Sequence, residues 1–194
     1  LKGGNALLKN ILLGYRGGIF PVNPKYAEIE GLTCYPSVGA IPDPVDLAVV
    51  FVPAPLVPAA VEDCVGKGVR GVMIESGGFA EAGPEGERLQ KTLTDIAART
   101  GIRLWGPNCM GLVDVVHRHI FSFMDPRAQE QEEFIPGTVS LVVQSGMLSA
   151  IFLIDIMSNA MMGVSKVCSL GNKLDVNECD ILEYFLDDPD TEPT

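Results

Sequence analysis

The sequence has no closely spaced cysteine pair, no excess of basic residues and no long apolar run. Lys and Arg number 14 against 25 Asp and Glu, and the formal charge of −11 excludes a broad surface for nucleic acid, which needs clustered cations. No apolar run reaches the roughly 18–20 residues that cross a bilayer. We therefore expect a soluble protein without nucleic acid or membrane as partner, which holds any anionic ligand locally.

The cysteines are odd in number and widely spaced, which is typical of reduced thiols in a cytoplasmic protein. They are Cys34, Cys64, Cys109, Cys168 and Cys179. The chain also begins at Leu1 without a methionine, so we expect residues to be missing before it.

The 194 residues are 47% hydrophobic with 21 Gly and 14 Pro, which predicts a packed, turn-rich α/β protein. Apolar runs alternate with helical periodicity, and strand–helix–strand order implies parallel pairing with right-handed crossovers. The run 45–52 is continuous, as in strands buried on both faces. We expect strands at 18–22, 45–52, 68–74, 102–105, 138–143 and 164–168, with helices at 5–13, 55–65, a stretch ending at 99, 147–157 and 177–186.

Several predicted strands end in turns rich in Pro, Asn and Gly, and ligands of open parallel sheets bind beyond the carboxyl ends of the strands. Lys25, after Asn23 and Pro24, can meet a phosphate as a point charge, although taken alone a surface lysine in a turn is favoured. The stretch Val52-Pro53-Ala54 offers backbone without long side chains, which suits a flat ring, although alone it is an ordinary helix start.

Two glycine-containing turns indicate anion sites. Ser76-Gly77-Gly78-Phe79 exposes backbone N–H groups that can cradle an anion, or is a plain strand-to-helix loop. Gln144-Ser145-Gly146 precedes a helix, so it presents N–H groups and the positive end of the helix dipole, or is a plain N-cap. A serine nucleophile is less attractive, because no paired histidine base is evident.

Other reactive residues have ordinary interpretations. Cys109 has no positive neighbour to lower its pKa, so a small buried residue is favoured over a nucleophile. His117 and His119 lack a third ligand at suitable spacing and are interpreted as surface residues, not a metal site. The acidic residues near the C-terminus predict mainly a solvated helix face, namely Glu178, Asp180, Glu183, Asp187 and Asp188.

Six motifs in one order resemble the nucleoside-diphosphate-forming (ADP-forming) acyl-CoA synthetases, relatives of the succinyl-CoA synthetase α subunit. They are Asn23-Pro24-Lys25, Val52-Pro53-Ala54, Ser-Gly-Gly-Phe-Ala-Glu at 76–81, Gly-Pro-Asn-Cys-Met-Gly at 106–111, Gln-Ser-Gly at 144–146 and Ser-Leu-Gly-Asn-Lys-Leu-Asp-Val at 169–176. Each is weak alone, but six in register are specific.

The resemblance implies a Rossmann-like doubly wound parallel CoA-binding domain over 1–125, with its first strand missing, and a linker over 126–137. Part of a flavodoxin-like, succinyl-CoA synthetase-like α/β domain follows over 138–194. It also implies an acid–thiol ligase in which an acyl phosphate forms, a histidine takes the phosphoryl group, CoA takes the acyl group, and the phosphohistidine passes its phosphate to a nucleoside diphosphate.

By this resemblance, CoA contacts are expected at Asn23, Pro24, Lys25, Val52, Pro53, Ala54, Ser76, Gly77, Gly78 and Phe79, with Asn108 and Cys109 near the thiol end. Ser145 and Gly146 are expected to hold phosphate beside the catalytic histidine, and Glu183 is a weaker match for the carboxylate that orients it.

Two features of the family are absent from the sequence. Neither histidine matches the catalytic one, which lies downstream of the position of Thr194 in relatives, and the ATP-grasp domain that binds Mg and ATP or ADP is missing. We therefore expect a fragment that is inactive alone, binds CoA and a carboxylic acid, and works with an ATP-grasp domain or subunit in a homo- or hetero-oligomer. The alternatives are a CoA-binding regulatory module of a protein acetyltransferase fusion, and an NAD(P)-binding Rossmann domain. The second is disfavoured because no GxGxxG follows a first strand.

Overall fold

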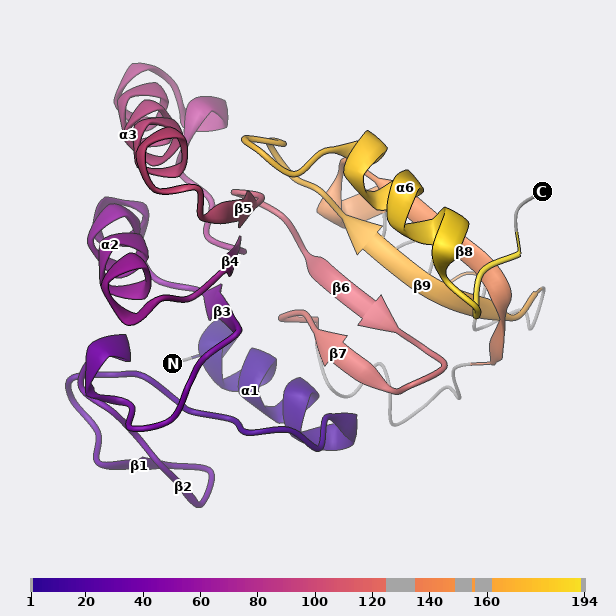
Figure 1. Cartoon of the computed structure of the whole chain (residues 1–194), viewed down its shortest axis with the longest axis horizontal. Helices are drawn as coiled ribbons and strands as arrows, with labels where there is room; N and C mark the ends of the chain where they lie inside the picture. The colour runs from indigo at the N-terminus through magenta and orange to yellow at the C-terminus, as the bar shows by residue number, and fades with distance from the viewer. Residues whose placement is uncertain (1, 125–134, 149–154, 156–161, 193–194) are drawn as a thin grey trace.

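The computed structural model describes residues 2–124, 135–148, 155 and 162–192 (Figure 1). Its strands form a two-stranded, a three-stranded and a four-stranded sheet. This is a mixed α/β fold with a parallel sheet, followed by a flavodoxin-like part, as the sequence predicts.

The three-stranded sheet is parallel, with the order β3-β4-β5. Its strands are β3 (Leu47–Val50), β4 (Gly71–Ile74) and β5 (Arg103–Trp105). Helix α2 (Val57–Lys67) connects β3 to β4, and α3 (Pro84–Thr100) connects β4 to β5. Both helices have Pro within their first two residues, where the missing N–H costs little, and both end at a glycine with positive φ, Gly68 and Gly101.

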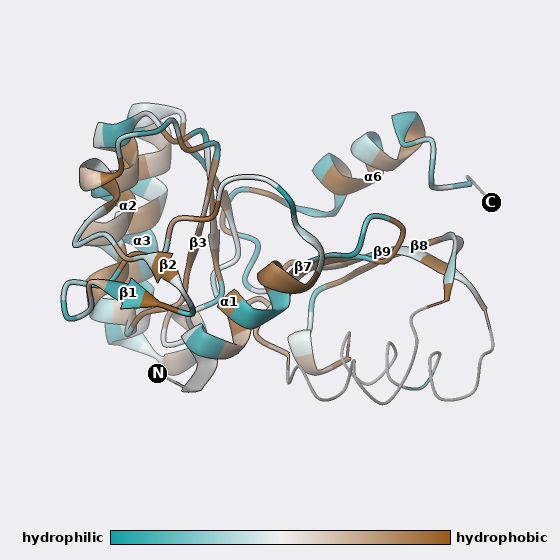
Figure 2. Ribbon diagram, turned by 90° about the horizontal axis from the view of Figure 1, so that it is seen from below, coloured by the Kyte–Doolittle hydropathy of each residue, from teal (hydrophilic) through white to brown (hydrophobic). Residues whose placement is uncertain are grey.

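The main core lies between this sheet and its two helices, which stand on the same side of it (Figure 1). Figure 2 shows apolar residues along β3 and a mixture of apolar and polar residues along α2 and α3. The fully buried residues of the main core include Val61 of α2, Ile74 of β4 and Leu93 of α3. On the opposite face, Trp105 contacts the second sheet and its Nε1–H donates to the Ser169 carbonyl over 2.7 Å.

The four-stranded sheet has the order β7-β6-β9-β8. Strands β8 and β9 pair in parallel, as predicted, whereas β6 is antiparallel to both β7 and β9. The strands are β6 (Gly111–Asp114), β7 (His119–Phe121), β8 (Pro136–Val143) and β9 (Val164–Ser169). Helix α6 (Glu178–Asp187) packs on this sheet through Ile181 and Phe185.

The remaining elements are an N-terminal helix, a short hairpin and short 3-10 turns. Helix α1 (Lys2–Gly14) includes the predicted helix at 5–13 and contacts β7. Tyr15, directly after α1, lies edge-on to His119 with ring centroids 5.2 Å apart. Strands β1 (Glu28–Ile29) and β2 (Leu32–Thr33) form a short hairpin. The described residues also form the short 3-10 turns η1 (Val38–Ala40), η2 (Ala54–Leu56) and η3 (Ala80–Ala82).

One strand prediction was wrong, and so was the burial expected for another strand. The expected strand at 18–22 is only an isolated bridge between Val22 and Tyr35, because Pro21 has no backbone N–H and no described strand lies alongside. The run 45–52 is not buried on both faces: β3 is the edge strand of its sheet, and Leu47 is 43% exposed.

Strands β6 and β7 lie within the predicted first domain, yet β6 pairs with β9 of the predicted second part. The sheet therefore joins the two parts of the chain. The predicted linker at 126–137 falls largely outside the described residues, as does most of the predicted helix at 147–157. The domain boundaries stay a prediction.

Candidate functional site

The turns after β3, β4 and β5 meet at one point. The backbone N–H of Val52 donates to Ser76 Oγ over 3.0 Å, and the N–H of Asn108 donates to the Ser76 carbonyl over 2.9 Å. Three of the predicted binding segments, 52–54, 76–79 and 108–109, are thereby brought together at the carboxyl ends of the parallel strands.

Small residues let these turns approach closely. A Cβ on Gly77 would lie 3.0 Å from Asn108 Oδ1, and a Cβ on Gly78, whose φ is +102°, would lie 3.1 Å from the Cβ of Ala54. The side chains of Ala54, Ser76 and Phe79 are buried, and Phe79 belongs to the main core. The exposed residues of the three turns are Val52, Pro53, Gly77 and Asn108.

Cys109 is a buried thiol in the turn after β5. Its Sγ–H donates to the Ile74 carbonyl over 3.3 Å, and burial, reinforced by the charge of Glu75, raises the pKa of Cys109 to about 12. The thiol is therefore protonated at neutral pH, and the interpretation as a small buried residue is confirmed over that of a nucleophile.

Glu75 is the residue of this region that sequence reasoning missed. Glu75 follows β4 directly and is only 3% exposed. Within the described part of the chain, neither of its carboxyl oxygens has a hydrogen-bond partner of normal geometry. Burial raises the pKa of Glu75 well above its usual range, although the nearby backbone N–H of Phe123 opposes the shift. An enclosed acid of this kind is typical of functional sites, and its signal was a lone acid after an apolar strand.

Lys25 lies in a separate turn. Asn23 Oδ1 accepts the Lys25 backbone N–H over 3.0 Å, which shapes the turn, and the lysine side chain is exposed. Among the residues that the structure describes, no hydrogen bond joins Asn23, Pro24 or Lys25 to the three strand-end turns. Their contact with a ligand stays a prediction.

The turn Gln144–Gly146 lies against the same site. Ser145 Oγ accepts the Leu148 N–H over 3.3 Å, as an N-cap does, and a Cβ on Gly146 would lie 2.5 Å from Met110 Cγ. Because Met110 follows Cys109, the start of this helix adjoins the turn after β5. The sequence had placed these residues in separate domains.

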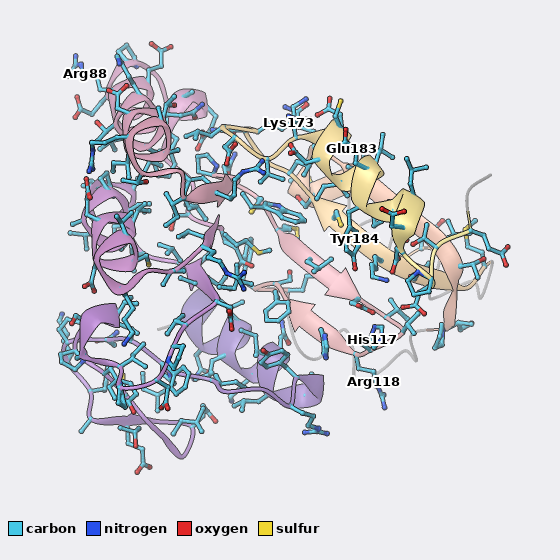
Figure 3. The ribbon with its side chains drawn as sticks, viewed as in Figure 1. Arg88, His117, Arg118, Lys173, Glu183 and Tyr184 are labelled. Carbon is cyan, nitrogen blue, oxygen red and sulfur yellow. The ribbon has the colours of Figure 1, made fainter. Side chains whose placement is uncertain are left out.

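Glu183 and the two histidines lie on other surfaces. Glu183 is exposed on α6, while His117 lies at the turn between β6 and β7 (Figure 3). His117 Nδ1 is 3.0 Å from Asp114 Oδ2, and the rings of His117 and His119 stack with centroids 5.7 Å apart. No set of three potential metal ligands is found within the described ranges. The role expected for Glu183 stays a prediction.

Comparison with known proteins identifies the families that the two parts of the chain match. The family described as CoA binding domain matches residues 2–114, and the succinyl-CoA ligase like flavodoxin domain matches residues 136–194. The acetate–CoA ligase [ADP-forming] I of Archaeoglobus fulgidus is 43% identical over 98% of this chain and 27% of its own length. The acetate–CoA ligase [ADP-forming] I subunit alpha of Pyrococcus furiosus is 40% identical over 98% of this chain and 41% of its own length.

The fold matches a solved structure of the same kind. The dinucleotide forming acetyl-coenzyme A synthetase 1 of Ca. Korarchaeum cryptofilum, in complex with phosphate and ADP, superposes with a TM-score of 0.89 at 34% identity. The superposition covers 98% of this chain and 39% of that one, so the chain spans well under half of the relatives that it matches. None of the described helices is long and apolar enough to cross a membrane.

Proposed function

The chain belongs to the CoA-binding domain family, and from this membership we propose that it is the CoA-binding part of an ADP-forming acyl-CoA synthetase, an acid–thiol ligase of the cytoplasm. The observation that carries the proposal is the meeting of three strand-end turns with the turn Gln144–Gly146. In this proposal the CoA thiol lies at the strand-end turns, beside a helix start that suits a phosphoryl group.

CoA lies across the exposed ends of the parallel strands. Its phosphates are held locally by Lys25, since the net charge of −11 provides no broad cationic surface. Its thiol arm runs over the backbone of Val52 and Pro53 and past Gly77 toward Asn108. The buried Glu75, whose pKa is raised by burial, lies beside Cys109 at the thiol end.

The phosphoryl group is held at Ser145 and Gly146, where backbone N–H groups at a helix start offset its charge. The histidine that carries it, with Mg and ATP or ADP, comes from an ATP-grasp domain or subunit of the complete synthetase. The name of the Pyrococcus furiosus relative, a subunit alpha, supports this division of labour.

Calorimetric titration of the chain with CoA, with NAD as control ligand, tests the proposal. We expect saturable CoA binding and none with NAD. The Lys25→Ala variant loses a charge-assisted phosphate contact worth about 1–3 kcal/mol, or roughly fivefold to 150-fold in affinity.

Lys91→Ala is the matched control, because it removes the same charge from α3, where Lys91 pairs with Asp95. Saturation by NAD and not by CoA would replace the proposal with a dinucleotide-binding function. Equal affinities for Lys25→Ala and Lys91→Ala would place the phosphates elsewhere.

A further inference from the structure

The backbone N–H groups of Gly78 and Phe79, in the turn after β4, form a cradle that a side chain of the protein already fills. Gly78 and Phe79 turn their N–H groups toward one point, as the sequence predicts for an anion site. Glu81 Oε1 occupies that point and accepts both bonds, over 2.6 Å and 3.0 Å. The anion in the cradle is thus the carboxylate of the neighbouring turn η3.

The second oxygen of Glu81 reaches across to another loop. Glu81 Oε2 accepts from Asn172 Nδ2 over 2.6 Å, and the same amide donates to Gln90 Oε1 over 2.9 Å. Gln90, on α3, also accepts the Ala80 N–H over 3.3 Å. Asn172 lies between β9 and α6, so the three side chains Glu81, Gln90 and Asn172, here named the clasp, join segments more than 80 residues apart.

The loop gripped by the clasp contacts both halves of the candidate site. The Asn172 N–H donates to the Pro107 carbonyl over 2.8 Å, beside Asn108 and Cys109. The preceding residue, Gly171, donates its N–H to the Gln144 carbonyl over 3.0 Å. A side chain at Gly171, whose φ is +63°, would collide with the Pro107 carbonyl. The backbone of this loop therefore packs directly against the turn after β5.

We propose that Glu81 is a positioning residue: it fills the cradle as an internal counter-anion and holds Asn172, which aligns the turn Gln144–Gly146 with the turn after β5. This role rests on the proposed function, in which those two turns hold the phosphoryl group and the thiol. CoA phosphates then bind outside the cradle of Gly78 and Phe79.

The protonation of Glu81 fits the role. Partial burial acts to raise its pKa, but the bonds from Asn172 and from the Phe79 and Gly78 N–H groups outweigh it and lower the pKa below the ordinary value. Glu81 therefore stays a carboxylate at neutral pH, as the accepting oxygens of the clasp require.

Reciprocal exchange of amide and carboxylate tests the proposal. Glu81→Gln makes two amide N–H donors, from positions 81 and 172, face each other. Asn172→Asp makes two carboxylates face each other, so each single change removes the hydrogen bond between the two positions. The double variant E81Q/N172D restores one donor and one acceptor between the two positions. Glu85→Gln is the control, since Glu85 is an exposed acid near the start of α3 that pairs with Arg88.

Amide hydrogen exchange of the unliganded chain, followed by NMR, gives the readout. In each single variant we expect about tenfold faster exchange at Asn172 and Leu174, whose N–H groups bond to Pro107 and Gly106, with no change within β4. The double variant returns toward the parent rate, and Glu85→Gln matches the parent throughout. Unchanged exchange rates in both single variants, or no return toward the parent rate in the double variant, would contradict the proposal that Glu81 holds Asn172 in place.

The link to function is measured in the complete synthetase. The single variants should lower kcat about tenfold, with CoA affinity within about twofold of the parent, and E81Q/N172D should recover kcat. A loss of CoA affinity equal to the loss of kcat would overturn the positioning role in favour of direct CoA contact. Failure of the parent chain to bind CoA would instead refute the proposed function, because exchange in the unliganded chain reports on the clasp alone.

Discussion

At the scale of single residues, burial separates the five cysteines. Cys179 is exposed on α6, whereas Cys34, Cys64, Cys109 and Cys168 are buried. Burial raises the pKa of Cys64 to about 11 and that of Cys168 to about 12, so their thiolate fractions at pH 8 are negligible. The thiols are chemically distinct although the sequence gives them no obvious difference.

We predict that an aromatic disulfide reagent at pH 8 reacts rapidly with one thiol per chain. The other four should react only at the rate of unfolding, and Cys179→Ser should remove the rapid phase. The measurement is the absorbance of released thiolate with and without denaturant. A rapid phase of two or more equivalents would contradict the burial of the remaining thiols.

Glu75 sets a second prediction at this scale. Its pKa is raised in the folded protein, so the native state holds a proton that the unfolded chain releases above about pH 4.3. The contribution of Glu75 to stability therefore falls as pH rises through the range between the unfolded and folded pKa values.

Glu75→Gln should remove this pH-dependent cost, so its stability relative to the parent should rise between pH 5 and pH 8. Urea unfolding at the two pH values measures it, and Glu85→Gln should follow the parent because Glu85 is exposed. A constant difference between Glu75→Gln and the parent would show that Glu75 titrates alike in both states.

At the scale of elements, the start of α6 is fixed by a capping box that is visible in the local sequence. Asn177 Oδ1 accepts the Cys179 N–H over 2.8 Å, and Asp180 Oδ2 accepts the Asn177 N–H over 3.0 Å, which forms a capping box. Bonding to the Asn177 N–H, together with Arg103, lowers the pKa of Asp180.

Asn177→Ala should lower the free energy of unfolding by about 0.5–2 kcal/mol, since it leaves a helix N–H without its cap. Asn177→Ser keeps a capping oxygen and should lose far less. Thermal unfolding of both variants at pH 7 makes the comparison. Equal losses would assign the effect to packing at this position, not to the cap.

Elements marked by local signals were predictable, and elements that depend on distant partners were not. The strand predicted at 102–105 and the helix predicted at 177–186 match β5 and α6 closely. Strand β6 was missed because its partner β9 lies about 50 residues later. The β1–β2 hairpin was missed because its turn puts Glu30 at φ +50°, where Asn or Asp is the usual signal.

The candidate site divides in the same way. Strand ends indicated the turns at 52–54, 76–79 and 108–109, because parallel strands end at one edge. No sequence signal indicated that Glu81 bonds to Asn172, since the two residues are 91 positions apart. Burial of Glu75 likewise depends on how β4 packs against the later β6–β7 hairpin.

At the scale of the whole molecule, a buried ion pair ties the end of the chain to the second sheet. Lys166 Nζ on β9 lies 2.7 Å from Asp188 Oδ2, and the two side chains are 5% and 3% exposed. Thr191 Oγ1 donates to the same carboxylate oxygen over 2.5 Å, and Ser140 of β8 lies 2.8 Å from Thr191 Oγ1. Burial acts to lower the pKa of Lys166, but the bond to Asp188 raises it overall.

Lys166→Met should lower the free energy of unfolding by about 3–5 kcal/mol, because it leaves Asp188 buried without its cation. Arg70→Met is the control: Arg70 pairs with Asp46, but the side chains are 84% and 82% exposed, so we expect a loss below about 1 kcal/mol. Urea unfolding at pH 7 compares the two. Similar losses would show that burial does not determine how much these ion pairs contribute to the free energy of unfolding.

The pairing of β6 with β9 has a consequence for how the molecule can be divided. The four-stranded sheet takes β7 and β6 from one half of the chain and β9 and β8 from the other. A cut between residues 125 and 134 would leave each half with an open strand edge that fits its counterpart. The backbone hydrogen bonds between β6 and β9 are therefore the seam along which the two halves of the chain form one sheet.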